Sequence, residues 1–229
     1  SYLGTIQTVK GIGMKFLAFL MAFSWLAVSG SAQAEDFAFE EGTHYVALEI
    51  PIKTRNPNKI EVAEYFSYGC PHCYDFEPLI GAWQAALPED VVFSRTPAVW
   101  NRDYQVYAQS YVTLEALGIL EKVHVAIFNA IHTERQRLNT PQTMAQFLVK
   151  YGVDPEDFAK TYNSFGVRAA LQQADSKGRA YRSTGVPAII VNGKYRIEGS
   201  MARTNANMLR IASFLIEKER QQLASAPKS

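Results

Sequence analysis

The sequence has little cysteine and no excess of charge of either sign. Only 2 of its 229 residues are cysteine, and 23 basic against 22 acidic side chains leave a net charge of +1. A nearly neutral chain gives no support to nucleic-acid binding or to electrostatic attachment to a membrane surface. With 48% hydrophobic residues the chain is not of the disordered class, and it is long enough for one large domain or two small ones.

The N-terminal part lacks acidic residues and also lacks an apolar run long enough to span a bilayer. The run Phe16–Val28 follows Lys15 and is shorter than the roughly 20 residues that a spanning helix needs. It is followed by small residues that end in an A-x-A pattern at Ala34, which is typical of a cleavable export signal. We predict that residues 1–34 are a signal region that starts at Met14 and is cleaved after Ala34. An uncleaved anchor is the alternative.

The two cysteines lie three positions apart, in Cys70-Pro71-His72-Cys73. In an oxidising compartment a cysteine pair is normally a structural disulfide. A bridge across two residues, however, closes a very small loop and removes little entropy from the unfolded chain. The spacing therefore favours redox chemistry over structural cross-linking.

A redox pair of this kind requires a strand before it and a helix after it. Residues 60–67 have the β-branched and aromatic content of a strand, which predicts the strand. Pro71 suits the first turn of a helix, and apolar side chains follow at helical spacing, namely Phe76, Leu79, Ile80, Trp83 and Leu87. Cys70 is then at a helix N-terminus, where backbone N–H groups and the helix dipole favour a thiolate. We expect Cys70 to be exposed and Cys73 to be more buried.

Strand patterns occur in the first and last parts of the remaining chain. They cover residues 44–50, where Val46, Leu48 and Ile50 share one face, and residues 91–95, 188–191 and 194–197. The turn Asn192-Gly193 between the last two strands is a strong hairpin signal. A terminal helix follows, with apolar positions at Met208, Ile211, Leu215 and Ile216.

Helix patterns alone fill the middle of the chain, from about residue 101 to about 178. Thr140-Pro141 and Asp154-Pro155 are helix starts, and Gly118 and Gly152 are helix ends. Phe158, Tyr162 and Phe165 are expected on one inward face, and Trp100 is expected in a core. The order predicts an α/β fold in which a sheet domain, residues 35–100 and 179–229, is interrupted by a helical insertion, residues 101–178.

Four segments resemble the thioredoxin superfamily and, within it, the DsbA family. They are Glu64–Ser67, Cys70–Glu77, Thr184–Ala188 and Val191–Tyr195, and the resemblance covers essentially the whole chain after the signal region. It implies a thioredoxin fold interrupted by an all-helical insertion and a periplasmic oxidoreductase that donates its disulfide to newly exported proteins. Tyr68-Gly69 precedes the first cysteine, where other members can be more aromatic; the difference is expected to alter substrate fit and not the reaction.

The resemblance also implies partners and no cofactor. The expected partners are unfolded or newly exported proteins with cysteines, and a quinone-linked membrane protein of the DsbB type that restores the disulfide. No segment suggests dimerisation, so a monomer is expected.

Further roles at the dithiol follow from position and from the resemblance. Pro71 and His72 lie between the cysteines, where a charged His72 would stabilise the thiolate, although it could also be a solvent-facing turn residue. Glu64 shares a strand face with apolar residues and is expected to be a buried carboxyl that relays the proton of Cys73; a solvated edge position is the alternative. Glu77 is expected to be solvated.

The region around Pro187 gains its expected role from the resemblance. Pro187 is similar to the superfamily's cis-proline that packs against the disulfide, with an ordinary trans loop as the alternative. The backbone of Val186 would then pair with an extended client segment by strand addition.

Two other functions remain open from the sequence. An isomerase or reductase uses the same chemistry, but such proteins usually carry a dimerisation module or a different pair between the cysteines. A metal-binding or holdase module is a second alternative; a closed zinc site needs four ligands, whereas the chain has two cysteines and no histidines at metal-binding spacing.

Overall fold

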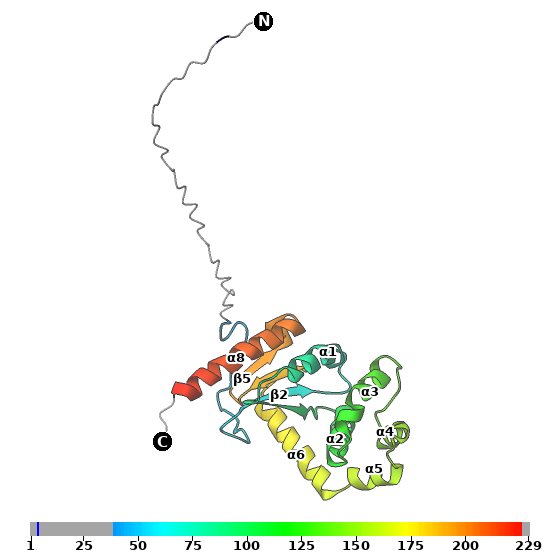
Figure 1. Ribbon diagram of the computed structural model, residues 1–229. Coiled ribbons are helices and arrows are strands. Elements are labelled where there is room, and N and C mark those ends of the chain that lie inside the picture. The colour runs from blue at the N-terminus through cyan, green and yellow to red at the C-terminus, as the bar shows by residue number, and fades with distance from the viewer. Residues whose placement is uncertain (1–3, 5–38, 226–229) are drawn as a thin grey trace. The chain divides into compact units, whose positions relative to one another are not determined.

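A computed structural model describes residue 4 and residues 39–225 (Figure 1). Residues 38–229 make up one compact unit, to which the elements below belong. The predicted signal region, with its start at Met14 and its cleavage site at Ala34, lies outside the described residues apart from Gly4. In the part of the chain that the structure describes, no helix combines the length and apolarity that crossing a membrane requires.

A five-stranded mixed sheet lies at the centre, in the order β1-β5-β4-β2-β3. The strands are β1 (Val46–Ala47), β2 (Ile60–Phe66), β3 (Val91–Pro97), β4 (Ala188–Val191) and β5 (Tyr195–Glu198). Only β2 and β3 are parallel, and α1 (Pro71–Ala85) connects them. The βαβ start and the final hairpin are therefore confirmed.

Five α-helices and one short 3-10 helix stand between β3 and β4. They are α2 (Arg102–Ala116), α3 (Leu120–His132), α4 (Pro141–Leu148), η1 (Val149–Tyr151), α5 (Pro155–Tyr162) and α6 (Phe165–Ala180). The predicted starts are confirmed, because the side chains of Thr140 and Asp154 cap α4 and α5 and a proline follows each cap. Gly152 ends η1 in the left-handed conformation.

Two helices close the chain, α7 (Gly199–Ala202) and α8 (Asn205–Ser225). In Figure 1, α1 and α8 cover one face of the sheet and α6 lies on the other. Along β2, Ile60 and Val62 pack with α1 and α8, whereas Ala63 and Tyr65 belong to the core on the opposite face. The alternation puts Glu64 on the α1 side, below the dithiol.

Several sequence expectations about single residues are wrong. The first strand is reduced to two residues, and Ile50 is exposed because the chain leaves the sheet after Leu48. Phe165 is 80% exposed because it begins α6 instead of ending α5, so the inward face stops at Tyr162. Trp100 and Leu79 are also exposed, although Trp100 stacks on Tyr104.

Candidate active site: a dithiol at the start of α1

Cys70 is the N-cap of α1, as the sequence predicted. β2 ends at Phe66, three residues form a tight connection, and Cys70 then takes an extended backbone conformation before the helical Pro71. Its sulfur accepts a hydrogen bond from the backbone N–H of Cys73, with 3.4 Å between donor and acceptor. Pro71 and His72 are exposed in the first turn, and both cysteines are free thiols.

The burial of the two cysteines differs from the expectation for one of them. Cys73 is fully buried, as expected, but Cys70 is only 5% exposed. Both cysteines belong to a core that includes Tyr68 and Tyr107, with Val186 packed against it. Gly69 is equally confined, because an added Cβ would come within 2.9 Å of the Tyr107 ring. An aromatic side chain at position 69 would therefore not fit beside α2.

The two thiols differ in acidity. The hydrogen bond with the Cys73 side chain, backbone N–H groups and the charge of His72 lower the pKa of Cys70 to about 6, against the opposing effect of burial. Burial raises the pKa of Cys73 well above its ordinary value, and the neighbouring Cys70 acts in the same direction. A thiolate is therefore stabilised at Cys70 and a neutral thiol at Cys73.

The loop before β4 lies directly against Cys70. The Cys70 thiol donates a hydrogen bond to the carbonyl oxygen of Val186 over 3.3 Å, although 116 positions separate them in the chain. The Val186–Pro187 peptide bond is cis. The structure thus brings Cys73 and Val186 within hydrogen-bond distance of the Cys70 sulfur.

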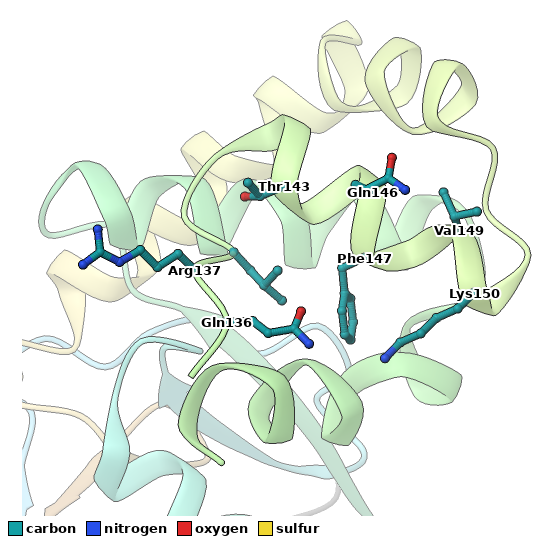
Figure 2. A pocket seen from close by; sticks show the side chains of 8 residues that line it. Gln136, Arg137, Thr143, Gln146, Phe147, Val149 and Lys150 are labelled. Atoms are coloured by element: carbon teal, nitrogen blue, oxygen red, sulfur yellow. The ribbon is translucent and has the colours of Figure 1, made fainter. Parts of the chain in front are cut away.

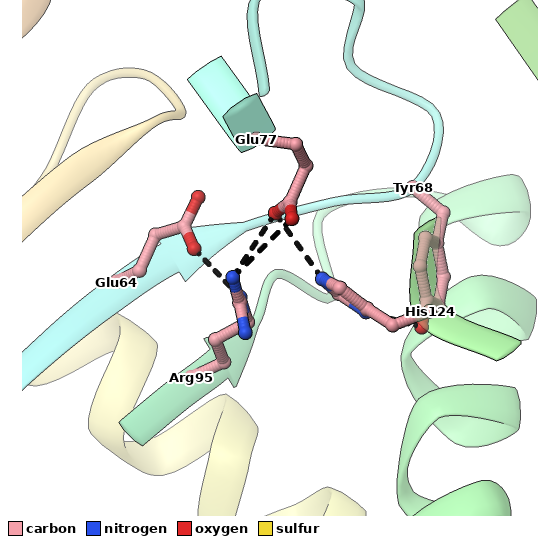
Figure 3. A network of polar contacts seen from close by, with 5 residues as sticks. All are labelled: Glu64, Tyr68, Glu77, Arg95 and His124. Atoms are coloured by element: carbon pink, nitrogen blue, oxygen red, sulfur yellow. Dashed lines mark hydrogen bonds and ion pairs between the residues drawn. The ribbon is translucent and has the colours of Figure 1, made fainter. Parts of the chain in front are cut away.

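A network of buried charges joins β2, β3, α1 and α3 (Figure 3). Arg95 on β3 donates from Nε to Glu64 Oε2 over 2.8 Å and from Nη2 to Glu77 Oε1 over 3.2 Å. Burial raises the pKa of Glu64 from 4.5 to about 7, with the Arg95 charge opposing it. The second carboxylate oxygen of Glu64 is buried and has no hydrogen-bond partner among the described residues. The expectation of a buried Glu64 carboxyl is confirmed.

The expectation of a solvated Glu77 is wrong. Its side chain is buried on the inner face of α1, where Arg95 and His124 both reach the carboxylate. Burial would raise the pKa of Glu77, but the hydrogen bond from His124 and the Arg95 charge hold it below its ordinary value. Glu77 is therefore the anion that balances Arg95.

Sequence reasoning missed Arg95, His124 and Tyr68 as parts of this site. Glu64 and Arg95 are direct partners in the parallel register of β2 and β3, so pairing the two predicted strands would have revealed the ion pair. The phenol of Tyr68 bonds to His124 Nδ1 over 2.8 Å, and His124 comes from α3. No spacing in the sequence links these two residues, because their contact depends on how α3 docks.

A separate hollow of about 650 Å³ opens on the helical block, between α4 and the segment before it. Figure 2 shows Arg137 and Lys150 at its sides and Phe147 at its floor. None of its lining residues belongs to the segments that carry the dithiol or the cis peptide bond. We therefore assign it no part in the dithiol chemistry.

Together, the sheet order, the Cys-x-x-Cys pair capping α1 and the adjacent cis-proline define a thioredoxin-fold thiol:disulfide oxidoreductase. Comparison with known proteins identifies the family within that class. Residues 84–213 match the family of DSBA-like thioredoxin domains. The chain belongs to the DsbA family.

The named relatives cover most of the chain. The thiol:disulfide interchange protein DsbA of Pseudomonas aeruginosa is 47% identical over 190 residues, 83% of this chain and 89% of that protein. DsbA of Azotobacter vinelandii is 47% identical over 78% of this chain and 84% of its own length.

Solved structures of the family superpose on this fold. The crystal structure of Pseudomonas aeruginosa DsbA matches with a TM-score of 0.78 at 45% identity, over 82% of this chain and 97% of that chain. The oxidoreductase DsbA from Xylella fastidiosa matches with a TM-score of 0.76 at 33% identity, over 80% and 98%. The thioredoxin fold with its helical insertion is thereby confirmed.

Proposed function

We propose that the chain is an exported oxidase that donates the Cys70–Cys73 disulfide to newly exported proteins in the periplasm. The observation that carries the proposal is the placement of the two sulfurs: Cys70 caps α1 and accepts a backbone N–H, whereas Cys73 is fully buried. This placement lowers the pKa of Cys70 and raises the pKa of Cys73. A stabilised Cys70 thiolate favours the dithiol form, so the disulfide form passes its bond on readily. DsbA is itself the standard example of a protein whose reduced form is stabilised in this way.

The reaction proceeds in two exchanges. A client thiolate attacks the Cys70 sulfur, the Cys70–Cys73 bond breaks, and Cys73 leaves with the electron pair and takes up a proton. A second client thiolate then attacks the client sulfur of the mixed disulfide, and Cys70 leaves as the thiolate. The client dithiol is oxidised to a disulfide and the enzyme gains the two electrons. Attack at Cys70 is favoured because its sulfur lies next to the Val186 backbone and its side chain keeps 5% exposure, whereas Cys73 has none.

Glu64 is suited to supply the proton that Cys73 takes up. Its pKa of about 7 leaves a large share of the carboxyl protonated at neutral pH, and its charge acts on the pKa of Cys73. Its partnerless oxygen leaves one position of the carboxyl without a bond to Arg95. His72 acts at the other thiol, where its charge stabilises the leaving Cys70 thiolate.

The backbone at Val186 and Pro187 is the proposed client-binding edge. The Val186 carbonyl already lies within hydrogen-bond reach of the reacting sulfur. An extended client segment that pairs with this backbone would place its own cysteine beside Cys70 without demanding a particular sequence. Such binding suits clients that are still unfolded.

Turnover requires an oxidant that takes two electrons from the Cys70–Cys73 dithiol. A quinone-linked membrane protein of the DsbB type is the proposed acceptor, and a monomer is the proposed state of this chain. Export rests on the signal pattern that ends at Ala34.

Trapping of mixed disulfides tests the proposal. Cys73→Ala, expressed in the periplasm, should accumulate covalent complexes with many proteins that dithiothreitol releases, because the enzyme thiolate that reverses the first exchange is absent. Cys70→Ala should form none. A Cys73→Ala protein that stays free of partners would contradict the oxidase proposal and leave the metal or holdase alternative.

A further inference from the structure

Two histidines of α3 hold the residue that precedes the dithiol by two positions. His124 and His132 lie about two turns apart and so share one face of the helix. His124 Nδ1 lies 2.8 Å from the Tyr68 hydroxyl, and His132 Nε2 lies 2.8 Å from the Tyr68 carbonyl oxygen. One helix of the insertion thus reaches both polar ends of a single residue.

The direction of each hydrogen bond follows from the partners. The Tyr68 carbonyl can only accept, so His132 donates from Nε2. Glu77 is held as a carboxylate, so His124 donates to it from Nε2, over 3.2 Å. The Nδ1 atom of a neutral His124 is then free to accept from the Tyr68 hydroxyl, and burial lowers the pKa of His124, which favours the neutral ring.

Both imidazole rings are themselves fixed by packing. His132 stacks on the ring of Tyr74, with centroids 5.1 Å apart and planes 17° apart. Tyr74 directly follows Cys73 on α1, so His132 also contacts the helix that carries the dithiol. His124 is enclosed by aromatic rings, including those of Phe66 and Phe128.

The segment that these histidines hold is short and tightly bonded to Cys70. The backbone N–H of Cys70 donates to the Ser67 carbonyl over 3.1 Å, and the Gly69 N–H donates to the Ser67 hydroxyl over 3.2 Å. Gly69 lies so close to α2 that an added Cβ would come within 2.9 Å of the Tyr107 ring. A shift of Tyr68 is therefore passed on to the Cys70 sulfur.

We propose that His124 and His132 are positioning residues. Their hydrogen bonds to Tyr68 hold the Cys70 sulfur at the N-terminus of α1. The inference rests on the proposed function of the dithiol. It gives the helical insertion a part in setting the redox equilibrium. Neither histidine contacts a reacting atom, and both act through the segment Ser67–Gly69.

Loss of a hydrogen bond between Tyr68 and either histidine should make the disulfide less oxidising. The Cys70 thiolate needs the backbone N–H groups of His72 and Cys73 to be aligned with its sulfur. With one hydrogen bond to Tyr68 lost, we expect the equilibrium constant against glutathione to move about fivefold toward the disulfide form. The pKa of Cys70 should rise toward its ordinary value.

The test uses matched variants of the exported protein. His132→Leu removes the donor, whereas His132→Gln keeps an amide nitrogen in the place of Nε2. Tyr68→Phe removes only the hydroxyl group, and His124→Phe keeps a ring without its nitrogens. His44→Gln, outside α3, is the control. The measurements are the glutathione equilibrium, the pH midpoint of thiolate absorbance, and the unfolding free energy of both redox forms.

The proposal predicts altered equilibria for His132→Leu and Tyr68→Phe and near wild-type values for His132→Gln and His44→Gln. The double variant His124→Phe/Tyr68→Phe should shift the equilibrium by less than the sum of the single changes. Equal destabilisation of both redox forms with unchanged thiolate midpoints would overturn it, since that is what a merely structural role produces. If His124→Phe does not fold, Tyr68→Phe decides. A weakly oxidising wild-type protein would overturn the proposed function. The thiolate midpoints of the variants would still test whether His124 and His132 position Cys70.

Discussion

Cys70 and Cys73 are chemically equivalent in the unfolded chain, and their positions in the first turn of α1 make them different. The cap position gives Cys70 backbone donors, whereas the position one turn later places Cys73 in the core. This difference could be predicted from the spacing and the flanking pattern alone. The burial of Cys70 could not, because the covering residues come from α2 and from the loop before β4.

Glu64 offers a test at the same scale through the pH dependence of stability. Its pKa is 4.5 in the unfolded chain and about 7 in the fold, so the folded protein holds a proton that the unfolded chain has lost. The free energy of unfolding therefore falls as pH rises through this window, and the loss is complete above pH 7. Between pH 5 and pH 8 ionisation of Glu64 should lower the free energy of unfolding of the wild-type protein by about 2 kcal/mol.

Urea unfolding of wild-type and Glu64→Gln proteins at both pH values measures this contribution. The variant should lack most of the decrease and should also form mixed disulfides with clients more slowly at pH 7. A Glu64→Gln protein with the same pH slope as the wild type would show that Glu64 is ionised throughout and unsuited to the proton relay.

At the scale of elements, local sequence signals located nearly every helix and strand. Caps such as Thr140 and Asp154 and the Asn192-Gly193 turn act within a few residues, so they are readable without the fold. Register and docking are not readable in this way. The pairing of Glu64 with Arg95 depends on β2 and β3, and the buried carboxylate of Glu77 depends on α3.

The hairpin gives a prediction at this scale. Gly193 has a φ of +62°, and an added Cβ would fall on the Ile52 carbonyl oxygen. Gly193→Ala should therefore lower the free energy of unfolding by about 1–3 kcal/mol. Gly81→Ala is the matched control, because Gly81 lies within α1 with open space around it and should be neutral or slightly stabilising. Similar unfolding midpoints in urea for the two variants would contradict the role of the turn.

At the scale of the whole molecule, the sheet domain and the helical block meet at the dithiol. β2, β3 and α1 supply Glu64, Arg95 and Glu77, and α3 supplies the histidine that bonds to Glu77. The carboxyl end of β2 points toward the helical block (Figure 1), so Tyr68 enters a core made mostly by helices α2 to α5. The helical insertion therefore contributes side chains that pack directly against the active site.

Formation of the Cys70 thiolate makes the stability of the reduced protein depend on pH. The pKa of Cys70 is about 6 in the fold and 9.0 in an unperturbed chain. The stabilisation of the reduced form is therefore complete above pH 9, decreases as pH falls, and is lost as pH passes through 6. In the oxidised form no thiolate exists, so the reduced protein should be the more stable form at neutral pH.

The most direct measurement is the redox equilibrium of the exported protein in glutathione buffers at pH 7, with the thiols counted by alkylation. We expect a midpoint potential well above that of the glutathione couple, and a reduced form that melts at a higher temperature than the oxidised form. A midpoint potential close to that of thioredoxin, about −270 mV, would make the chain a reductase and would contradict thiolate stabilisation at Cys70.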